Sequence, residues 1–375
     1  MRFTINKDQF LKSLLRAGHA ISPKAVVPLM SNVMLNLSEK GLQITGTNDE
    51  MTIRCTVPYM IGEIEIIRGA GMGSTLINAH LLTEVVRKMD GNDVTVEIVD
   101  NAIAKIDDGR SSFKLNCARA EEYPDIDLEL NGQILDLRCQ DFALLVEQSA
   151  FAASGKGNQR PVLSAVNLEA NGAGVLTATA TDSARLAQKQ LHVDSDVKFN
   201  VNVKAKILAE VARLFELTEM VRIAVSDNKI LFDFDNAVVS TRLIADPYPV
   251  PKTIFQQTYN YSLEVNAQEL ADAIERVSIL SADKDFAVKL SMREDLVEVH
   301  SRSETNGSAN EAVQTFSFNG SRLEVSFNPL FVLDAIKALR SEDVVFCFQA
   351  EMRPFVVKNP KDDSVIELIT PMRTY

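Results

Sequence analysis

The last nine residues, ELITPMRTY (367–375), have two earlier counterparts in the chain, and the spacing of the three stretches decides the fold. The counterparts are CARAEEYPDI (117–126) and TRLIADPYPVP (241–251). Their aligned prolines, at positions 124, 249 and 371, are separated by about one third of the 375-residue chain. This period predicts three tandem domains of similar size, which we place at 1–126, 127–253 and 254–375.

Two helical patterns recur in each third. The first covers 8–22, 140–154 and 268–281, and the second covers 78–89, 203–215 and 327–340. Between them lie runs that alternate apolar and polar residues, such as GLQITGT and KILFDF, with Gly, Asn and Asp at their ends. This pattern is typical of antiparallel strands with one buried face. We therefore predict an α+β chain in which each domain packs two helices on antiparallel sheets.

The composition is that of an ordinary globular protein, with 46% hydrophobic and 24% charged residues and a net charge of −12. The sequence has neither a run of about 18 apolar residues nor an apolar signal segment at its start. We therefore expect a cytoplasmic protein without a membrane anchor. The four cysteines and four histidines are scattered without the spacing of metal ligands. We expect neither a metal site nor a cofactor.

A basic residue recurs at one place in all three second helices, three residues after an aligned acid: Arg87, Arg213 and Lys337. Each alone is explained by an ion pair within a solvated helix, such as Glu84 with Arg87. Recurrence in an acidic chain favours a shared surface that faces phosphates. The expected DNA-facing set comprises Lys12, Arg16, Lys24, Arg87, Lys88, Gln148, Arg160, Lys204, Lys206, Arg213, Arg276, Lys337 and Arg340.

Two stretches could carry chemistry, and both are incomplete. RGAGMGSTL (68–76) resembles a dinucleotide-binding loop, but Ser74 stands where GxGxxG needs its last glycine, so a turn between strands is favoured. TDSARLAQ (181–188) brings a hydroxyl, a carboxylate and a guanidinium together without an adjacent base. Asp182 is better interpreted as a turn or cap residue. The sequence favours a non-catalytic protein. Two alternatives are an enzyme that uses the 68–76 loop and a scaffold that only binds peptides.

Five motifs that span the chain resemble the bacterial DNA polymerase III β subunit family, the processivity clamps: PLMSNVML, RPVLSAV, ATDSARLA, FNPLFVLDAIKAL and ITPMR. The resemblance implies a ring of two head-to-tail subunits, with six domains, helices lining a central hole and sheets outside. It implies a DNA sliding clamp that encircles double-stranded DNA independently of sequence and confers processivity on the replicative polymerase. The implied partners are a second copy of the chain, the polymerase catalytic subunit, a clamp loader, and translesion polymerases and repair proteins that carry short linear motifs.

The resemblance also implies a hydrophobic pocket between the second and third domains that receives these motifs, with the C-terminal strand as one wall. An apolar floor with a methionine suits several different peptides, and we expect Leu186 and Met372 to lie partly open to solvent. The matching positions are Leu163, Thr181, Ser183, Ala184, Arg185, Leu186, Pro249, Ile254, Asn328, Phe331, Leu368, Ile369, Pro371, Met372 and Arg373.

This chain departs from the family pattern at two places near the pocket. Ser183 and Ala184 stand where the family often has glycine and histidine, and Thr374 and Tyr375 extend the chain beyond Arg373. The upper rim of the pocket is therefore expected to differ.

The resemblance finally implies a subunit interface. SFKLN (112–116) matches an edge strand of the family and places Phe113 and Leu115 there, while Ile279 and Leu280 lie at the facing edge of the third domain. Pairing of edge strands across subunits would hide their unpaired backbone groups.

Overall fold

Asparagine side chains begin four of the helices in the computed structural model, which describes residues 1–22, 27–48, 50–155, 160–216, 219–249, 258–280 and 287–373. Asn6, Asn78, Asn266 and Asn328 each accept a hydrogen bond from a backbone N–H two or three residues later, which satisfies a donor that the helix leaves free. The described helices are α1 (Lys7–Gly18), α2 (Ala79–Lys88), α3 (Cys139–Glu147), α4 (Ala205–Leu214), α5 (Ala267–Ser278) and α6 (Pro329–Leu339).

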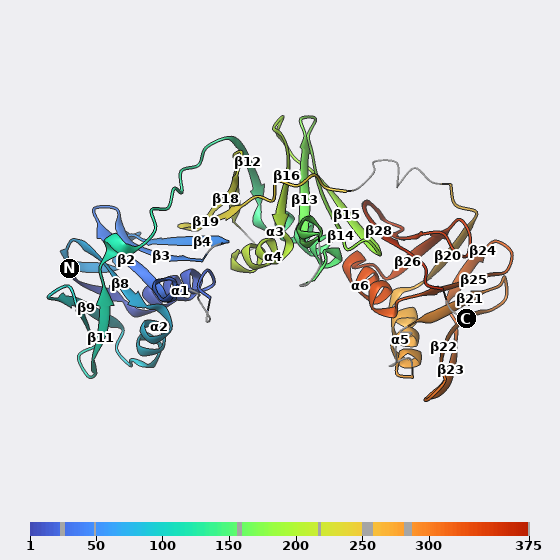
Figure 1. Cartoon of the computed structure of the whole chain (residues 1–375), viewed down its shortest axis with the longest axis horizontal. Helices are drawn as coiled ribbons and strands as arrows, with labels where there is room; N and C mark the ends of the chain where they lie inside the picture. The colour runs from blue at the N-terminus through green and yellow to red at the C-terminus, as the bar shows by residue number, and fades with distance from the viewer. Residues whose placement is uncertain are drawn as a thin grey trace. The chain divides into compact units, whose positions relative to one another are not determined.

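The contacts within the chain define two compact units (Figure 1). Unit 1 comprises Met1–Gln140 with Glu210–Leu243, and unit 2 comprises Asp141–Ala209 with Ile244–Tyr375. The central third of the chain is therefore shared between them. The three-domain boundaries chosen from the sequence divide the chain differently, and they stay a prediction.

In unit 1, one antiparallel sheet joins strands of the first and central thirds. Its order is β12-β17-β18-β19-β4-β3-β2-β8-β11-β10-β9-β1-β7, and β19 pairs with β4 where the two thirds meet. The strands are β1 (Arg2–Asn6), β2 (Asn32–Ser38), β3 (Gly41–Thr47), β4 (Met51–Val57), β7 (Ile67–Gly71), β8 (Gly73–Asn78), β9 (Asp93–Val99), β10 (Ile103–Asp107), β11 (Ser112–Ala118), β12 (Gln133–Arg138), β17 (Met220–Val225), β18 (Lys229–Phe234) and β19 (Ala237–Arg242). A separate hairpin pairs β5 (Met60–Ile61) with β6 (Ile64–Glu65).

Unit 2 repeats the arrangement with a nine-stranded and a four-stranded sheet. The orders are β16-β13-β14-β15-β28-β27-β26-β20-β24 and β23-β22-β21-β25, and here β15 pairs with β28 where the central and last thirds meet. The strands are β13 (Ala165–Asn171), β14 (Val175–Thr181), β15 (Arg185–His192), β16 (Lys198–Lys204), β20 (Tyr261–Asn266), β21 (Val288–Met292), β22 (Val297–Ser303), β23 (Gly307–Val313), β24 (Phe316–Asn319), β25 (Leu323–Phe327), β26 (Asp343–Phe348), β27 (Phe355–Asn359) and β28 (Asp362–Ile369).

Apolar side chains between helices and sheets form the core of each unit. In unit 1, α1 and α2 pack together over residues that include Phe3, Phe10 and Leu82. In unit 2, α5 and α6 pack together over residues that include Leu270 and Phe346. The α+β fold with two helices against antiparallel strands is thus confirmed. Within the described ranges, none of the helices has the length and apolar character that a membrane crossing requires.

Candidate functional site

A tight turn between β14 and β15 presents the residues at the centre of the expected pocket. The Asp182 Oδ1 atom accepts hydrogen bonds from the backbone N–H groups of Ala184 and Arg185, at 2.9 and 3.0 Å. The Thr181 hydroxyl donates to the Arg185 carbonyl oxygen at 2.6 Å and accepts from the Ser183 N–H at 3.1 Å. Ser183 has a φ of 83° and its side chain is exposed. The interpretation of Asp182 as a turn residue is therefore confirmed.

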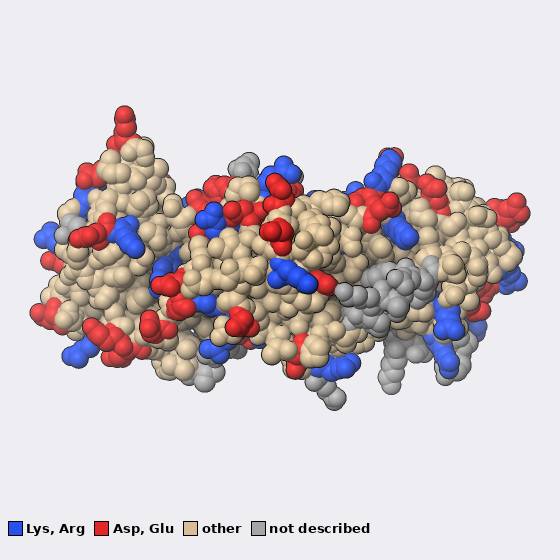
Figure 2. Space-filling view, turned by 90° about the horizontal axis from the view of Figure 1, so that it is seen from above, with Lys and Arg blue, Asp and Glu red and all other residues tan. Residues whose placement is uncertain are grey.

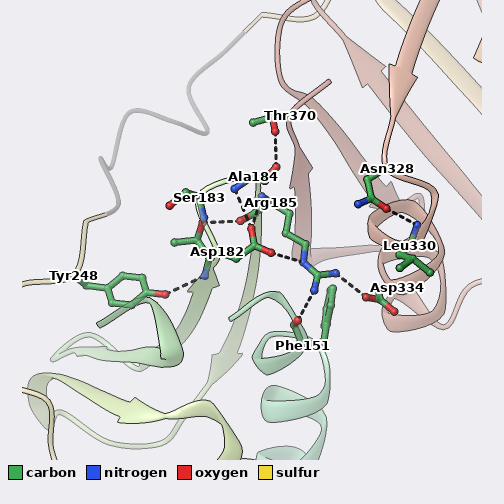
Figure 3. Close-up of polar contacts among 11 residues, drawn as sticks. Phe151, Asp182, Ser183, Ala184, Arg185, Tyr248, Asn328, Leu330, Asp334 and Thr370 are labelled. Carbon is green, nitrogen blue, oxygen red and sulfur yellow. Dashed lines mark hydrogen bonds and ion pairs between the residues drawn. The ribbon is translucent and has the colours of Figure 1, made fainter. Parts of the chain in front are cut away.

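Arg185 connects this turn to α6 within unit 2 (Figure 3). Its guanidinium donates to Asp182 Oδ2 at 3.1 Å, to the Phe151 carbonyl oxygen at 2.9 Å and to Asp334 Oδ2 at 2.6 Å. It also lies over the ring of Phe331, 4.5 Å from the centroid. The Arg185 side chain is only 13% exposed, so these contacts hold it in one position rather than leave it as a mobile surface charge.

The C-terminal strand is tied to the same turn. β28 pairs with β15 so that Leu368 lies opposite Leu186. The backbone N–H and the hydroxyl of Thr370 both bond to the Ala184 carbonyl oxygen, at 2.9 and 2.7 Å. The Met372 N–H bonds to the Ser326 carbonyl oxygen at 2.7 Å. The chain beyond the last strand is therefore ordered against unit 2 as far as Met372.

The apolar members of the expected pocket divide into a buried floor and a half-open wall. Leu163, Leu186, Leu368 and Ile369 are buried. Thr181 is also buried, and Ile254 lies outside the described residues. The other members are half-buried or exposed: Ala184, Arg185, Asn328, Phe331, Pro371, Met372, Ser183, Pro249 and Arg373. The expectation that Leu186 is partly open was wrong: it is 3% exposed, because Val356 and Leu368 cover it. Met372 is half-buried, as expected.

Two features close to the expected pocket in sequence were not predicted. Leu330, in the first turn of α6, is an exposed leucine next to Phe331. Glu367, next to Leu368, is 2% exposed, and its Oε1 atom has no hydrogen-bond partner. Burial raises the pKa of the Glu367 carboxyl well above its usual value, and Arg185 only partly opposes this.

The recurring bases of the second helices lie on the surface. Two of the three already bond to a carboxylate. Arg87 bonds to Glu84 and Arg213 bonds to Glu210 on the same helix, the latter pair at 2.8 Å. Lys337 is exposed in the last turn of α6. Exposed ion pairs of this kind contribute about 0 to 1 kcal/mol. A phosphate can therefore replace either carboxylate at small cost.

Other members of the expected DNA-facing set are held by acids from distant parts of the sequence. In unit 1, Arg16 pairs with Asp235 at 2.5 Å, and Lys12 pairs with Glu216 at 2.6 Å. In unit 2, Arg276 pairs with Glu311 and Arg340 with Glu147. Lys88, Arg160 and Lys206 are exposed and Lys204 is half-buried, whereas Lys24 lies outside the described residues.

Gln148 does not belong to this surface. It is 3% exposed, and its side-chain nitrogen donates to the Ala338 carbonyl oxygen at 2.8 Å. The side chain joins the end of α3 to α6 inside unit 2 and is out of reach of a phosphate. Figure 2 shows the molecule from above, and on this face many Lys and Arg side chains lie among Asp and Glu side chains.

The expected interface residues lie at exposed edges of the two units. Phe113 is exposed, and Leu115 is half-buried, in the part of β11 that pairs only with β10. Ile279 is 73% exposed. Ile279 and Leu280 follow the end of α5 and belong to no strand, whereas the outer strand of the four-stranded sheet beside α5 is β23. Any strand added at this edge would therefore pair with β23, with Ile279 beside it.

No group of three or more His, Cys, Asp and Glu side chains in the described parts of the chain is arranged to hold a metal ion. The site is instead a rigid polar turn, an apolar floor and a half-open wall. Such an arrangement suits binding of a short peptide segment, in which apolar contacts give affinity and a few fixed polar groups give orientation.

Comparison with known proteins accounts for the whole chain. Three family models match in order: the N-terminal domain of the DNA polymerase III beta subunit over residues 1–127, its central domain over 136–250 and its C-terminal domain over 252–373. The Beta sliding clamp of Bacillus subtilis (strain 168) is 30% identical and that of Staphylococcus aureus 31% identical, each over 100% of both chains. The crystal structure of the DNA polymerase sliding clamp from Bacillus subtilis superposes with a TM-score of 0.96 at 30% identity, and that of the DNA polymerase III beta chain from Streptococcus pneumoniae TIGR4 with 0.95 at 30%, both over 100% of both chains.

The fold and these comparisons thus indicate a sliding clamp that serves the processivity of DNA replication. The chain belongs to the DNA polymerase III beta subunit family.

Proposed function

We propose that two copies of this chain join head to tail into a ring of six domains, bounded in each copy at 1–126, 127–253 and 254–375. The ring encircles duplex DNA in the cytoplasm without sequence preference. The observation that carries the proposal is the recurrence of an exposed base, Arg87, Arg213 and Lys337, on the second helix of all three repeats. Their weak, replaceable carboxylate partners suit a surface that must slide, because a tight grip on phosphates would impede movement.

The retention of such a clamp on DNA comes from closure of the ring. Nonspecific phosphate contacts alone give dissociation constants of about 10⁻⁴ to 10⁻⁶ M at physiological salt. The chain as a whole has a net charge of −12, and the acidic remainder outside the DNA-facing set faces outward and disfavours binding of DNA elsewhere on the surface. The DNA-facing set that we propose keeps all the expected basic residues and omits Gln148, which is buried.

The site around Arg185 is proposed to tether partners through short linear motifs. The replicative polymerase, the clamp loader, translesion polymerases and repair proteins would take turns at it. The half-buried Phe331, Pro371 and Met372 leave apolar surface open beside a fixed polar turn, which supports a pocket for the apolar side chains of a Leu- and Phe-containing motif. Burying one such side chain contributes about 1.5 to 3 kcal/mol.

Ring assembly is tested by placing charge at the proposed interface. Ile279→Asp with Leu280→Asp should give a folded monomer, because it puts uncompensated charge into an apolar contact between subunits. Ile279 is 73% exposed in the single chain, so folding of the subunit itself should suffer little. Light scattering should report the mass of a dimer for the parent and of a monomer for the variant.

The matched control for assembly is Met352→Asp, which changes an exposed methionine of unit 2 that lies outside the proposed interface. It should leave the dimer intact. A dimer that persists in the Ile279 and Leu280 variant would remove these residues from the interface.

A further inference from the structure

At the boundary between the first and central repeats, a turn makes the same pattern of hydrogen bonds as the turn at the site around Arg185. Asn48 Oδ1 accepts from the N–H groups of Glu50 and Met51, at 2.9 and 2.8 Å, as Asp182 Oδ1 accepts from Ala184 and Arg185. The Thr47 hydroxyl donates to the Met51 carbonyl oxygen at 3.4 Å. The bonds of Asn48 and Thr47 span the same numbers of residues as the bonds of Asp182 and Thr181. Met51 therefore occupies the position of Arg185.

Two longer-range contacts extend the match. The Thr241 hydroxyl of β19 donates to the Glu50 carbonyl oxygen at 2.9 Å; the carbonyl oxygen of Ala184 likewise accepts from a threonine hydroxyl, that of Thr370, which lies one residue beyond the counterpart of Thr241. The hydroxyl of Tyr123, which precedes Pro124, reaches the carbonyl oxygens of Thr45 at 3.3 Å and Asn32 at 3.5 Å.

The second tyrosine closes its own repeat in the same way. The Tyr248 hydroxyl, just before Pro249, donates to the Ala165 carbonyl oxygen at 3.2 Å and accepts from the Thr181 N–H at 3.0 Å. Asn32 and Ala165 each follow a short 3₁₀ turn and are the first residues of β2 and β13. At both boundaries a tyrosine hydroxyl thus bonds to the carbonyl oxygen of the residue that follows this turn.

A cleft of about 540 Å³ opens at the first of these boundaries, inside unit 1. This volume lies in the range of small-ligand and peptide sites. Its walls are the ends of β4 and β19 and the extended segment that begins at Pro124, with Met30 and Met51 among the lining residues. The cleft therefore stands at the place that the peptide site occupies at the second boundary.

The side chains that define the floor differ between the two sites. At the second boundary the paired residues Leu186 and Leu368 are both buried and apolar. At the first boundary the corresponding cross-strand pair is Thr52 and Ser240, and both line the cleft. The Thr52 hydroxyl already bonds to that of Thr47 at 2.6 Å, so a leucine or phenylalanine side chain would chiefly cover the Ser240 hydroxyl without offering it a hydrogen bond, which disfavours binding.

The charges that line the cleft are largely balanced. Lys229 bonds to the Asp127 carboxylate at 2.6 Å, and Arg242, its cross-strand neighbour, lines the cleft together with Glu50 and Asp125. In all, three carboxylates and two cations line the cleft, so an acidic ligand would meet the carboxylates and a basic ligand would meet the cations. An uncharged polar side chain avoids both penalties and can bond to the hydroxyls.

We infer that this cleft is a second peptide site of the clamp, which takes an extended segment anchored by an uncharged polar side chain (Ser, Thr, Asn or Gln) in place of Leu or Phe. The inference rests on the proposed function, because it takes the class of ligand from the equivalent site around Arg185. A partner with one apolar and one polar segment could then engage both sites of one subunit, with the gain in avidity that linked binding segments give.

Methionine methyl groups report on the two sites separately. Met30 and Met51 line the cleft, whereas Met372 belongs to the wall of the site around Arg185. The full chain is labelled with ¹³C at its methionine methyl groups, and each signal is assigned with a Met→Leu variant. The polar probe, acetyl-Ser-Gln-Ala-Thr-Ser-amide, should shift the signals of Met30 and Met51 and leave that of Met372. The apolar probe Gln-Leu-Ala-Leu-Phe should do the reverse.

Ser240→Leu supplies the matched variant, because Ser240 is only half-buried and its replacement restores the apolar character of the second site. It should weaken binding of the polar probe about tenfold, because the probe can no longer bond to the Ser240 hydroxyl, and leave the shift that the apolar probe causes at Met372 unchanged. Ser240→Ala should weaken the polar probe in the same direction, and unchanged signals of the other methionines verify the fold.

The two hypotheses fail in different ways. If the polar probe leaves Met30 and Met51 unshifted at about 5 mM, well above the range of a specific weak complex, or shifts Met372 instead, the second site is overturned. If the apolar probe leaves Met372 unshifted, the proposed function of the site around Arg185 fails, whatever the result at Met30 and Met51.

Discussion

The triple variant Arg87→Glu, Arg213→Glu and Lys337→Glu is expected to bind linear duplex DNA far more weakly than the parent. The slope of log affinity against log salt should become shallower by about 0.9 for each phosphate that the variant no longer neutralises. In the parent, Arg87 and Arg213 exchange the carboxylates of Glu84 and Glu210 for phosphates. In the variant, the same positions present pairs of acids. Titration of fluorescent duplex at several salt concentrations measures both quantities.

The matched control replaces three other arginines by Glu and changes the net charge by the same amount. Arg68, Arg222 and Arg322 also pair with acids, namely Asp93, Asp136 and Glu324. They lie on strands or just before one, away from the second helices. Their reversal to Glu should change the affinity and the slope much less. Equal losses in the two triple variants would mean that DNA senses only the overall charge and that the second helices face elsewhere.

The second large effect is expected at the site around Arg185. Met372→Ala with Phe331→Ala should weaken binding of a Gln-Leu-Ala-Leu-Phe peptide by about 2 kcal/mol or more, as truncation of central anchor residues does. Both side chains are only half-buried, so stability should fall less than the 2 to 5 kcal/mol typical of buried truncations. Leu186 is excluded from this test because it is buried and its truncation would confound binding with folding. Calorimetry measures the affinity.

The control for the peptide site is Met352→Ala, which truncates an exposed methionine elsewhere in unit 2 and should leave the peptide affinity unchanged. DNA binding and the mass of the dimer should be unaffected by the double variant. Equal peptide affinity for parent and double variant would leave the C-terminal segment as a core strand without a binding role.

The repeat period and the alternation of apolar residues were sufficient to predict the α+β fold and the two helices of each repeat. Further signals were present in the sequence and were not used. An asparagine precedes α1, α2, α5 and α6, which is a recognisable start of a helix. Alternation along β28 puts Glu367 on the same face as Val365 and Ile369, so its burial was predictable too.

Other features depend on contacts between segments that are distant in sequence. The pairing of Arg276 with Glu311 and of Arg340 with Glu147 follows from tertiary packing and has no local pattern. The burial of Gln148 against Ala338 likewise needs the position of α6. The cover that Val356 and Leu368 place over Leu186 depends on the pairing of β15 with β28, which joins two repeats.

The central claim is that two copies of this chain close into a ring. It is tested most directly by electron microscopy of the purified protein, with class averages of single particles. The account predicts an annulus made of two subunits, with six domains around a central hole wide enough for duplex DNA. Particles without a hole, or single open chains at concentrations where light scattering reports a dimer, would contradict it.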